Sequence, residues 1–277
     1  MSNRKVKIIS ATPTFWEYWK EVFEYRELFW ILAKRDIMVR YKQTIFGVAW
    51  SVLRPLISSL VYVFGVNKIG TLGADSEIPY ILVILSGNIL WLFFSQSLST
   101  IGLSMVTNTN LVSKVFFPRI IIPFSSFFLG LLDVIIGMIV FIGFCVYSNF
   151  LPDYKIIFAP LFITLAYMAA SGIGLFAAVL NVKYRDIGQL IPFILSFGLF
   201  ISPVLYTTAK VTNPLAYKIF VLNPVTGCID AMRWCMLGDH FTFNWDSFIP
   251  LVIFCFVSLI LSIRFFRKHE NSFVDYI

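Results

Sequence analysis

Long stretches without a charged side chain dominate this 277-residue sequence. Four of them contain no Asp, Glu, Lys or Arg, and they run from Ile78 to Ser113, Ile156 to Asn181, Ile187 to Ala209 and Ser247 to Ile263. Two more are apolar except for one charge each, and they run from Ile45 to Val66 and from Ile120 to Ser148. Because roughly 20 helical residues cross roughly 30 Å of hydrocarbon, each stretch is about long enough to span a membrane. The pattern predicts six transmembrane helices.

Composition agrees with the membrane class, since 58% of the residues are hydrophobic and only 13% are charged. Membrane strands would give short alternating segments, whereas these stretches are continuous and rich in Leu, Ile and Phe. We therefore expect an all-α membrane protein. No signal peptide is visible ahead of the first apolar stretch, so we expect the first span to be retained.

The expected organisation has three parts. Residues 1–45 form a cytoplasmic amphipathic interface segment, residues 46–268 the six-helix transmembrane domain, and residues 269–277 a cytoplasmic tail. The expected spans cover about 46–66, 79–103, 120–148, 156–180, 189–206 and 248–266. With both termini inside, most of the 22 Lys and Arg residues lie on the cytoplasmic side, as the positive-inside rule requires. The net charge of +7 then reflects attraction to anionic lipid, and we do not expect nucleic-acid binding.

Three connecting segments carry helical patterns of their own. Before the first span, Phe15, Trp19, Val22 and Phe23 recur at helical spacing, which predicts an amphipathic surface helix. The loop from Ser104 to Arg119 is expected to hold a short cytoplasmic helix. In the last outer loop, two apolar segments shorter than a span predict two re-entrant or interfacial helices, and they are Leu215 to Leu222 and Val225 to Leu237.

The fourth expected span repeats a small residue every four positions, at Ala166, Ala170, Gly174 and Ala178. This spacing places a groove along one helix face, so another helix should pack closely there. The segment Asn181 to Asp186 is so short that the helices on either side of it should be adjacent and antiparallel.

Motifs for chemistry within the chain are missing from the sequence. There is no Gly-Lys dipeptide, so no phosphate-binding P-loop is present. The two histidines, His240 and His269, lie in separate loops without a partner motif, and we expect no metal site. The four cysteines, Cys145, Cys228, Cys235 and Cys255, are expected to be packing residues rather than disulfide partners.

Two charges interrupt the spans. Asp133 in the third span is either a proton-relay or substrate-path residue or a structural carboxylate satisfied by a neighbouring helix, with Arg54 as a candidate partner. Arg54 in the first span either reaches back to the inner interface or lines a path for an anionic substrate. Aromatic residues make up 18% of the chain and include the group Trp91, Phe93 and Phe94. Most of them should face lipid or the interface belts, although rings lining a cavity can stack on sugars.

Several motifs, in this order along the chain, carry a family resemblance. They are Arg35-Asp36-Ile37, Arg40-Tyr41-Lys42-Gln43-Thr44 with Phe46-Gly47, Trp50 and Pro55, then Trp91 with Phe93-Phe94-Ser95-Gln96, Asn110-Leu111-Val112, Phe117-Pro118-Arg119, Asn181 to Asp186, Leu222-Asn223-Pro224, Gly227 and Arg233-Trp234. Together they cover roughly Arg35 to Gly238. The chain resembles the permease subunits of ABC exporters for polysaccharides such as lipid-linked O-antigen.

The resemblance implies a homodimer of this chain with two copies of a separate cytoplasmic ATP-binding subunit, which would hold ATP and Mg, so that this chain needs no cofactor. The residues implied for ATPase coupling are Thr107, Asn108, Asn110, Leu111 and Lys114. Those implied for cytoplasmic substrate access are Arg40, Tyr41, Lys42, Gln43 and Arg54. The channel or gate candidates are Trp91, Phe93, Phe94, Gln96, Asp133, Asn223, Pro224 and Arg233.

The function so implied is transport, not catalysis: ATP-driven translocation of undecaprenyl-diphosphate-linked O-antigen polysaccharide across the bacterial inner membrane. For Arg40 and Lys42, contact with the lipid diphosphate and simple positive-inside anchoring remain equal alternatives. Exporters of capsular polysaccharide or teichoic acid are the nearest rivals. A membrane-embedded glycan-processing enzyme would need clustered acidic or metal-binding loops, and an ion-driven flippase would need several intramembrane charges.

Overall fold

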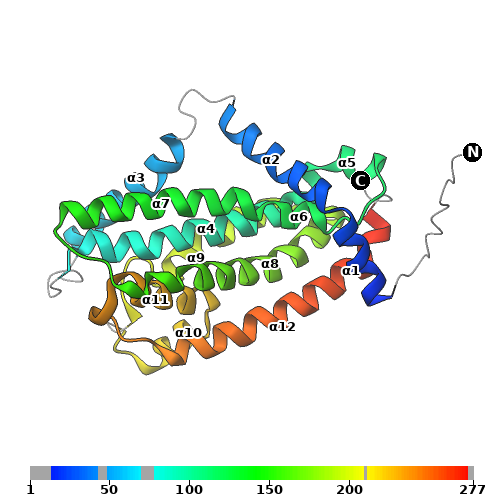
Figure 1. Cartoon of the computed structure of the whole chain (residues 1–277). Coiled ribbons are helices and arrows are strands. Elements are labelled where there is room, and N and C mark those ends of the chain that lie inside the picture. The colour runs from blue at the N-terminus through cyan, green and yellow to red at the C-terminus, as the bar shows by residue number, and fades with distance from the viewer. Residues whose placement is uncertain (1–13, 43–48, 70–77, 209–210, 274–277) are drawn as a thin grey trace, which may run out of the picture.

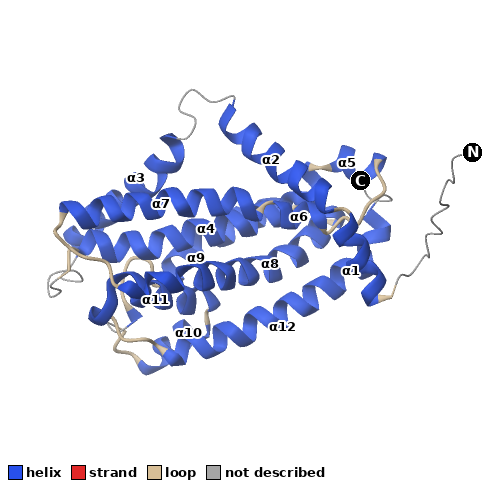
Figure 2. Cartoon of the chain, viewed as in Figure 1, coloured by secondary structure: helices blue, strands red, loops and turns tan. Residues whose placement is uncertain are grey.

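The protein is helical throughout the part of the chain that its computed structural model describes, which comprises residues 14–42, 49–69, 78–208 and 211–273. Every regular element in these ranges is an α-helix or a short 3-10 helix, and none is a strand (Figure 2). The predicted all-α fold class is confirmed.

Four long helices form the body of the molecule and lie side by side along its length (Figure 1). They are α4 (Tyr80–Thr107), α7 (Phe127–Tyr147), α8 (Ala159–Lys183) and α12 (Trp245–His269). Short helices extend two of them at their starts, α6 (Ile121–Ser125) before α7 and η1 (Tyr154–Phe158) before α8. Within the described residues, these four segments are long and apolar enough to cross a membrane.

Two further apolar helices are the remaining candidates for the six expected spans. They are α3 (Ala49–Ile69), which is apolar over Ala49–Gly65, and α9 (Ile187–Ile201). α9 ends earlier than predicted because Ser202 takes up an extended backbone ahead of Pro203, and a residue before proline disfavours the helical conformation. Its 15 residues are about 22 Å long, so a count of six spans stays a prediction.

The core lies around α4, which contacts α3, α7, α8 and α9. The small residues predicted to form a groove on α8 are buried, and Gly174 shows why they are needed. A Cβ atom on Gly174 would lie 2.8 Å from Cγ2 of Ile101 on α4. On another face of α8, a Cβ atom on Gly172 would overlap Ser258 of α12. Small side chains therefore allow α8 to pack closely between α4 and α12, as predicted.

The first two helices of the described residues lie at one end of the bundle, and they are α1 (Phe15–Glu24) and α2 (Arg26–Lys42). Thr14 and Glu17 form a capping box that begins α1. The predicted surface helix is present, but its apolar residues divide between two faces. Trp19 and Val22 pack toward the core, whereas Phe15 is 56% exposed and Phe23 is 68% exposed.

The same end, called the α5 end below, also holds α5 (Thr109–Lys114) and η4 (Glu270–Ser272) near the C-terminus (Figure 1). Glu270 joins three segments there. Its Oε2 accepts a hydrogen bond of 2.9 Å from the Tyr18 hydroxyl, and its Oε1 accepts one of 2.5 Å from the backbone N–H of Arg119. The Arg267 guanidinium lies 4.3 Å from the centroid of the Tyr18 ring. The first helix, the tail and the start of α6 are thus held together.

The opposite end, called the α11 end, contains α10 (Pro214–Leu222), α11 (Pro224–Leu237) and η3 (Gly238–His240). Both helices predicted in the last long loop are present, separated by Asn223. α11 is almost wholly buried, whereas α10 exposes Leu215 and Leu222. Whether these helices re-enter the membrane stays a prediction. All four cysteines are free and buried, which confirms them as packing residues.

Candidate functional site

A polar cluster lies where α2, α3 and α7 meet, and the Asp133 carboxylate of α7 is at its centre. The Ser51 hydroxyl donates a hydrogen bond of 2.8 Å to Oδ1 of Asp133, and the Tyr41 hydroxyl donates one of 3.2 Å to the same atom. Nη1 of Arg40 lies 2.7 Å from Oδ2, at angles outside those of a hydrogen bond, so this contact is an ion pair. The side chains of Arg40 and Asp133 are only 23% and 19% exposed.

The cation beside Asp133 is therefore Arg40, and the suggestion that Arg54 fills this place is wrong. Arg54 reaches α4 instead, where its Nη1 lies 3.4 Å from Oε1 of Gln96. Gln96 in turn donates a hydrogen bond of 3.1 Å to the hydroxyl of Thr100, one turn further along α4. These polar groups of α3 and α4 are not sealed in the core, since Arg54 is exposed and Gln96 is half-buried.

A second polar contact joins α3 to α4 nearer the α11 end. The side-chain amide of Asn88, fully buried on α4, donates hydrogen bonds to the hydroxyls of Ser58 at 2.6 Å and Ser59 at 3.0 Å. A buried carboxamide in apolar surroundings needs such partners. The pairing holds this part of α3 against α4.

The space inside the polar cluster is small. Arg40, Ser51, Arg54 and Asp133 line a pocket of about 20 Å³ together with apolar residues of α4 and α7. That volume admits a water molecule but nothing larger. The cluster in this conformation is a set of paired side chains, not a cavity for an organic ligand.

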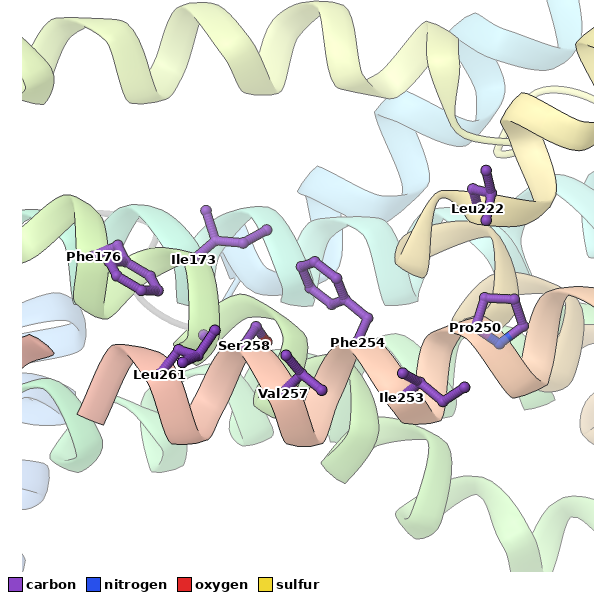
Figure 3. A pocket seen from close by; sticks show the side chains of 10 residues that line it. Ile173, Phe176, Leu222, Pro250, Ile253, Phe254, Val257, Ser258 and Leu261 are labelled. Atoms are coloured by element: carbon purple, nitrogen blue, oxygen red, sulfur yellow. The ribbon is translucent and has the colours of Figure 1, made fainter. Parts of the chain in front are cut away.

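A larger hollow in the described part of the molecule is apolar. It measures about 730 Å³ and lies between α8, α12 and the end of α10. Figure 3 shows Ile173 and Phe176 of α8 and Phe254 of α12 turned toward the same space, with Leu222 of α10 at one end. Ser258 is the one lining residue with a polar side chain, and its hydroxyl bonds the Cys255 carbonyl of its own helix. No charged side chain lines it, so it offers nothing to hold a polar ligand.

The sequence matches the family described as ABC-2 type transporter over residues 27–237. The chain belongs to the ABC-2 type transporter family. The match includes α2, the polar cluster around Asp133, α5 and α11, so the site described above lies inside the family's domain.

Full-length relatives of this ABC-2 transporter chain are also similar to it. Two proteins named O-antigen export system permease protein RfbA, from Klebsiella pneumoniae, are 25% and 24% identical over 251 residues, which is 90% of this chain and 94% of each relative. A protein of the same name from Myxococcus xanthus is 22% identical over 258 residues, 92% of this chain and 97% of that protein. The chain is thus a multi-pass transporter subunit.

The residues predicted to couple to an ATPase lie together at the α5 end. Asn108 ends α4 and begins α5, and Thr107, Asn110 and Lys114 are exposed beside it. Leu111 is half-buried, and the adjacent Val112 is buried and anchors α5 on the bundle. One contact was not predicted: Nη2 of Arg35 on α2 donates a hydrogen bond of 2.8 Å to Oδ1 of Asn108.

The predicted substrate-access residues are only partly brought together. Arg40, Tyr41 and Arg54 all border the cluster around Asp133, whereas Lys42 is exposed at the end of α2. Gln43 lies outside the described residues. Whether any of them contacts a substrate stays a prediction.

The channel and gate candidates fall into two groups. Gln96 and Asp133 belong to the polar contacts just described, whereas the aromatic candidates are packed inside the single chain. Trp91, Phe93 and Phe94 are each less than 10% exposed, and Trp91 fits against Gly198 of α9.

The candidates at the α11 end are also structural in this conformation. Asn223 caps α11, which begins at Pro224, and its side-chain amide donates a hydrogen bond of 3.1 Å to the Ser202 hydroxyl. Arg233 is 1% exposed and donates hydrogen bonds to the carbonyls of Val83, Val204 and Tyr206 at 3.2, 2.9 and 2.8 Å. It thereby anchors the segment that joins α9 to α10.

Sequence reasoning missed three polar residues that organise these contacts: Ser51, Asn88 and Glu270. Asn88 carried a usable signal, because it is a carboxamide inside a long charge-free stretch. Ser51 carried a weaker one, its position one turn before Arg54. Glu270 gave none, since a carboxylate in a terminal segment is usually solvated. Among the described residues no three His, Cys, Asp or Glu side chains gather as they would around a metal ion.

Proposed function

We propose that this chain is the membrane-spanning permease subunit of an ATP-driven exporter that moves undecaprenyl-diphosphate-linked O-antigen polysaccharide across a bacterial inner membrane. The observation that carries the proposal is the end-to-end similarity to three permeases named for O-antigen export, each matched over more than nine-tenths of its length. Similarity over whole chains favours a shared transport task, whereas a shared domain alone would favour only a shared fold.

A separate ATP-binding subunit is proposed to dock at the α5 end. The proposal is supported by α5, a short helix that exposes polar and apolar side chains on one side and is anchored on the bundle by the other. Asn110 and Lys114 are exposed on α5, and Val115 and Phe116 directly after it are 48% and 64% exposed. Apolar side chains beside polar ones are typical of protein interfaces. Two copies of the ATP-binding subunit would serve two copies of this chain.

A second copy of this chain is proposed to enclose the transport path. Arg54, Gln96 and Thr100 leave polar groups accessible on helices that are otherwise apolar, and contact with lipid would be costly for them. A polar path between two copies would solvate them. Arg54 has no carboxylate partner among the described residues, so its charge suits the diphosphate of a lipid-linked glycan.

The proposed location is the inner membrane with both termini in the cytoplasm. α1, α5 and the C-terminal η4 gather at one end of the bundle in Figure 1. That end also carries basic residues of several loops and helix ends, among them Lys114, Arg119, Arg264 and Lys268. Basic residues gathered at one end support a cytoplasmic assignment for it.

Deletion and complementation in the native cells test the proposal. Loss of the chain should remove the polysaccharide from the cell surface while lipid-linked glycan accumulates at the cytoplasmic face, and the wild-type gene should restore export. Loss of capsular polysaccharide or teichoic acid instead would show that this polymer, and not O-antigen, is the exported substrate. A normal amount of surface glycan with an altered composition in the deletion strain would favour a glycan-processing enzyme and contradict export.

A further inference from the structure

We propose that α2 is a rigid link that carries a displacement of α5 to the first turn of α3, with Asp133 as the positioning residue at its far end. The inference rests on the proposed function, because it describes how a signal from the ATP-binding subunit reaches the transport path. It assigns a role to two contacts, Arg35 with Asn108 and Arg40 with Asp133, that otherwise look unrelated.

The first contact joins α2 to α5. Nη2 of Arg35 donates a hydrogen bond of 2.8 Å to Oδ1 of Asn108, the residue that begins α5. The same guanidinium pairs with Asp36 at 2.7 Å, which holds its orientation. Asn108 is fixed in turn, because its amide donates a hydrogen bond of 2.9 Å to the Ser104 carbonyl. A movement of α5 therefore acts directly on α2.

The link itself is one unbroken helix. α2 runs from Arg26 to Lys42 without glycine or proline, the residues that usually bend helices. Arg35 and Arg40 are five residues apart, which separates the two contacts by about 7.5 Å along the helix axis. Over so short a distance a helix transmits displacement without bending.

The second contact joins the end of α2 to α7 and α3. The Asp133 carboxylate forms an ion pair with Arg40 of α2 and accepts hydrogen bonds from Tyr41 of α2 and Ser51 of α3. One carboxylate therefore holds both the end of α2 and the first turn of α3. The Tyr41 and Ser51 hydroxyls also lie 2.9 Å apart. Arg54 follows Ser51 by three residues, about one helical turn, so the direction of Arg54 depends on this carboxylate.

The paired charges of the cluster are partly accessible, which lets the contact hold α2 and still rearrange. Its charges are neither sealed in the core nor freely solvated, since Arg40 is 23% exposed and Asp133 is 19% exposed. Removal of the carboxylate should leave α2 attached through its aromatic contacts with α7, where Trp30 lies 4.6 Å from the Phe128 ring centroid. The helices would then remain packed while the transfer of movement to α3 is lost.

The test separates assembly, ATP hydrolysis and export for the complex of this chain with its ATP-binding subunit. The variant Asp133→Asn should assemble and hydrolyse ATP at about the wild-type rate, while export per ATP falls about tenfold, within the usual range of coupling between sites. The matched control Asp186→Asn changes an exposed carboxylate in the α8–α9 turn and should export normally.

The other end of the link is tested independently of the cluster. Arg35 lies at the surface with its side chain 40% exposed, so Arg35→Gln should fold even if a change at Asp133 does not. It should show the same loss of export per ATP, whereas the neighbouring exposed Lys34→Gln should not. Folding of each variant is checked by size-exclusion chromatography of the detergent-solubilised complex.

The outcomes separate the link from the proposed function. If the variants Asp133→Asn and Arg35→Gln both export as much glycan per ATP as the wild type, the link is overturned and the proposed function is unaffected. Parallel loss of assembly, ATP hydrolysis and export also overturns it, because a merely structural role predicts that pattern. A wild-type chain that recovers no ATP-binding subunit and exports no glycan contradicts the proposed function itself.

Discussion

The hydroxyl of Tyr18 donates a hydrogen bond of 2.9 Å to Oε2 of Glu270, a residue 252 positions further along the chain. Both side chains are buried at the α5 end, so this bond fastens the N-terminal helix to the tail. The variant Tyr18→Phe should lose about 1 kcal/mol of stability, seen as a lower melting temperature of the detergent-solubilised protein. The control Tyr147→Phe removes a hydroxyl from a side chain that is 84% exposed and should melt like the wild type. Equal melting of both variants would show that the bond contributes nothing.

The same carboxylate should give the protein a specific pH dependence. Burial raises the pKa of Glu270 above its ordinary value. The folded chain therefore keeps a proton that the unfolded chain has released, so the stabilisation is complete at acidic pH and is lost as the pH rises through the raised pKa. Relative to Glu270→Gln, the wild type should thus lose stability as the pH rises from the ordinary glutamate pKa of about 4.3 through the raised pKa of the folded protein. A constant difference in melting temperature between the two proteins across this range would contradict the prediction.

Arg233 should be among the least replaceable residues for stability. Its guanidinium is fully buried and bonds three backbone carbonyls, and Asp230 lies one turn away on the same helix. Arg233→Met leaves these three buried carbonyls without their donor, at a cost of about 1–3 kcal/mol for an unsatisfied buried group, which should lower the melting temperature by about 10 °C. Arg264→Met, at an exposed position near the α5 end of α12, is the comparison. A variant at Arg233 with wild-type yield and melting temperature would refute the anchoring role.

Two glycines should respond oppositely to the same substitution. Gly174→Ala places a methyl group 2.8 Å from the Ile101 side chain in the closely packed α4–α8 interface, and should destabilise by about 1–3 kcal/mol. Gly143→Ala on α7 meets no atom within 4 Å, so the better helix propensity of alanine should stabilise by up to about 1 kcal/mol. Thermal unfolding measures both. Equal shifts in one direction would show that packing against Ile101 is not what requires the glycine.

Arg54 should affect transport without affecting folding. Its exposed guanidinium meets Gln96 but no carboxylate among the described residues, so Arg54→Gln removes a charge from the proposed path and leaves no buried carboxylate unpaired. Surface polysaccharide should fall about tenfold, as for loss of one charge-assisted contact, and Arg54→Lys should retain part of it. Arg185→Gln, in the exposed α8–α9 turn, is the matched control. Full export by Arg54→Gln would exclude Arg54 from substrate handling.

Helix positions followed from the sequence because a charge-free stretch allows little besides a helix in a membrane. The small-residue repeat on α8 likewise predicted its close packing, since side-chain size decides how near two helices can come. The early end of α9 depended on a local effect of Pro203, which a count of apolar residues overlooks.

The pairing of charges was harder to predict than the helices. The sequence suggested Arg54 as the partner of Asp133. The observed pairing with Arg40 depends on how α2 lies across α7, which contacts such as Trp30 with Phe128 decide. Arg233 was a channel or gate candidate only through the family resemblance. Its three carbonyl partners come from distant segments, and sequence spacing carries no sign of them.

Affinity purification of the tagged chain from its native membranes, with an ATPase assay on what co-purifies, tests the central claim most directly. The account predicts a stoichiometric ATP-binding subunit and ATP hydrolysis, both lost when residues 107–114 are replaced by a Gly/Ser linker and both retained in the control Asp186→Asn. A chain that purifies alone from mild detergent, without an ATPase even after gentle crosslinking, would contradict the claim that it is the permease of an ATP-driven exporter.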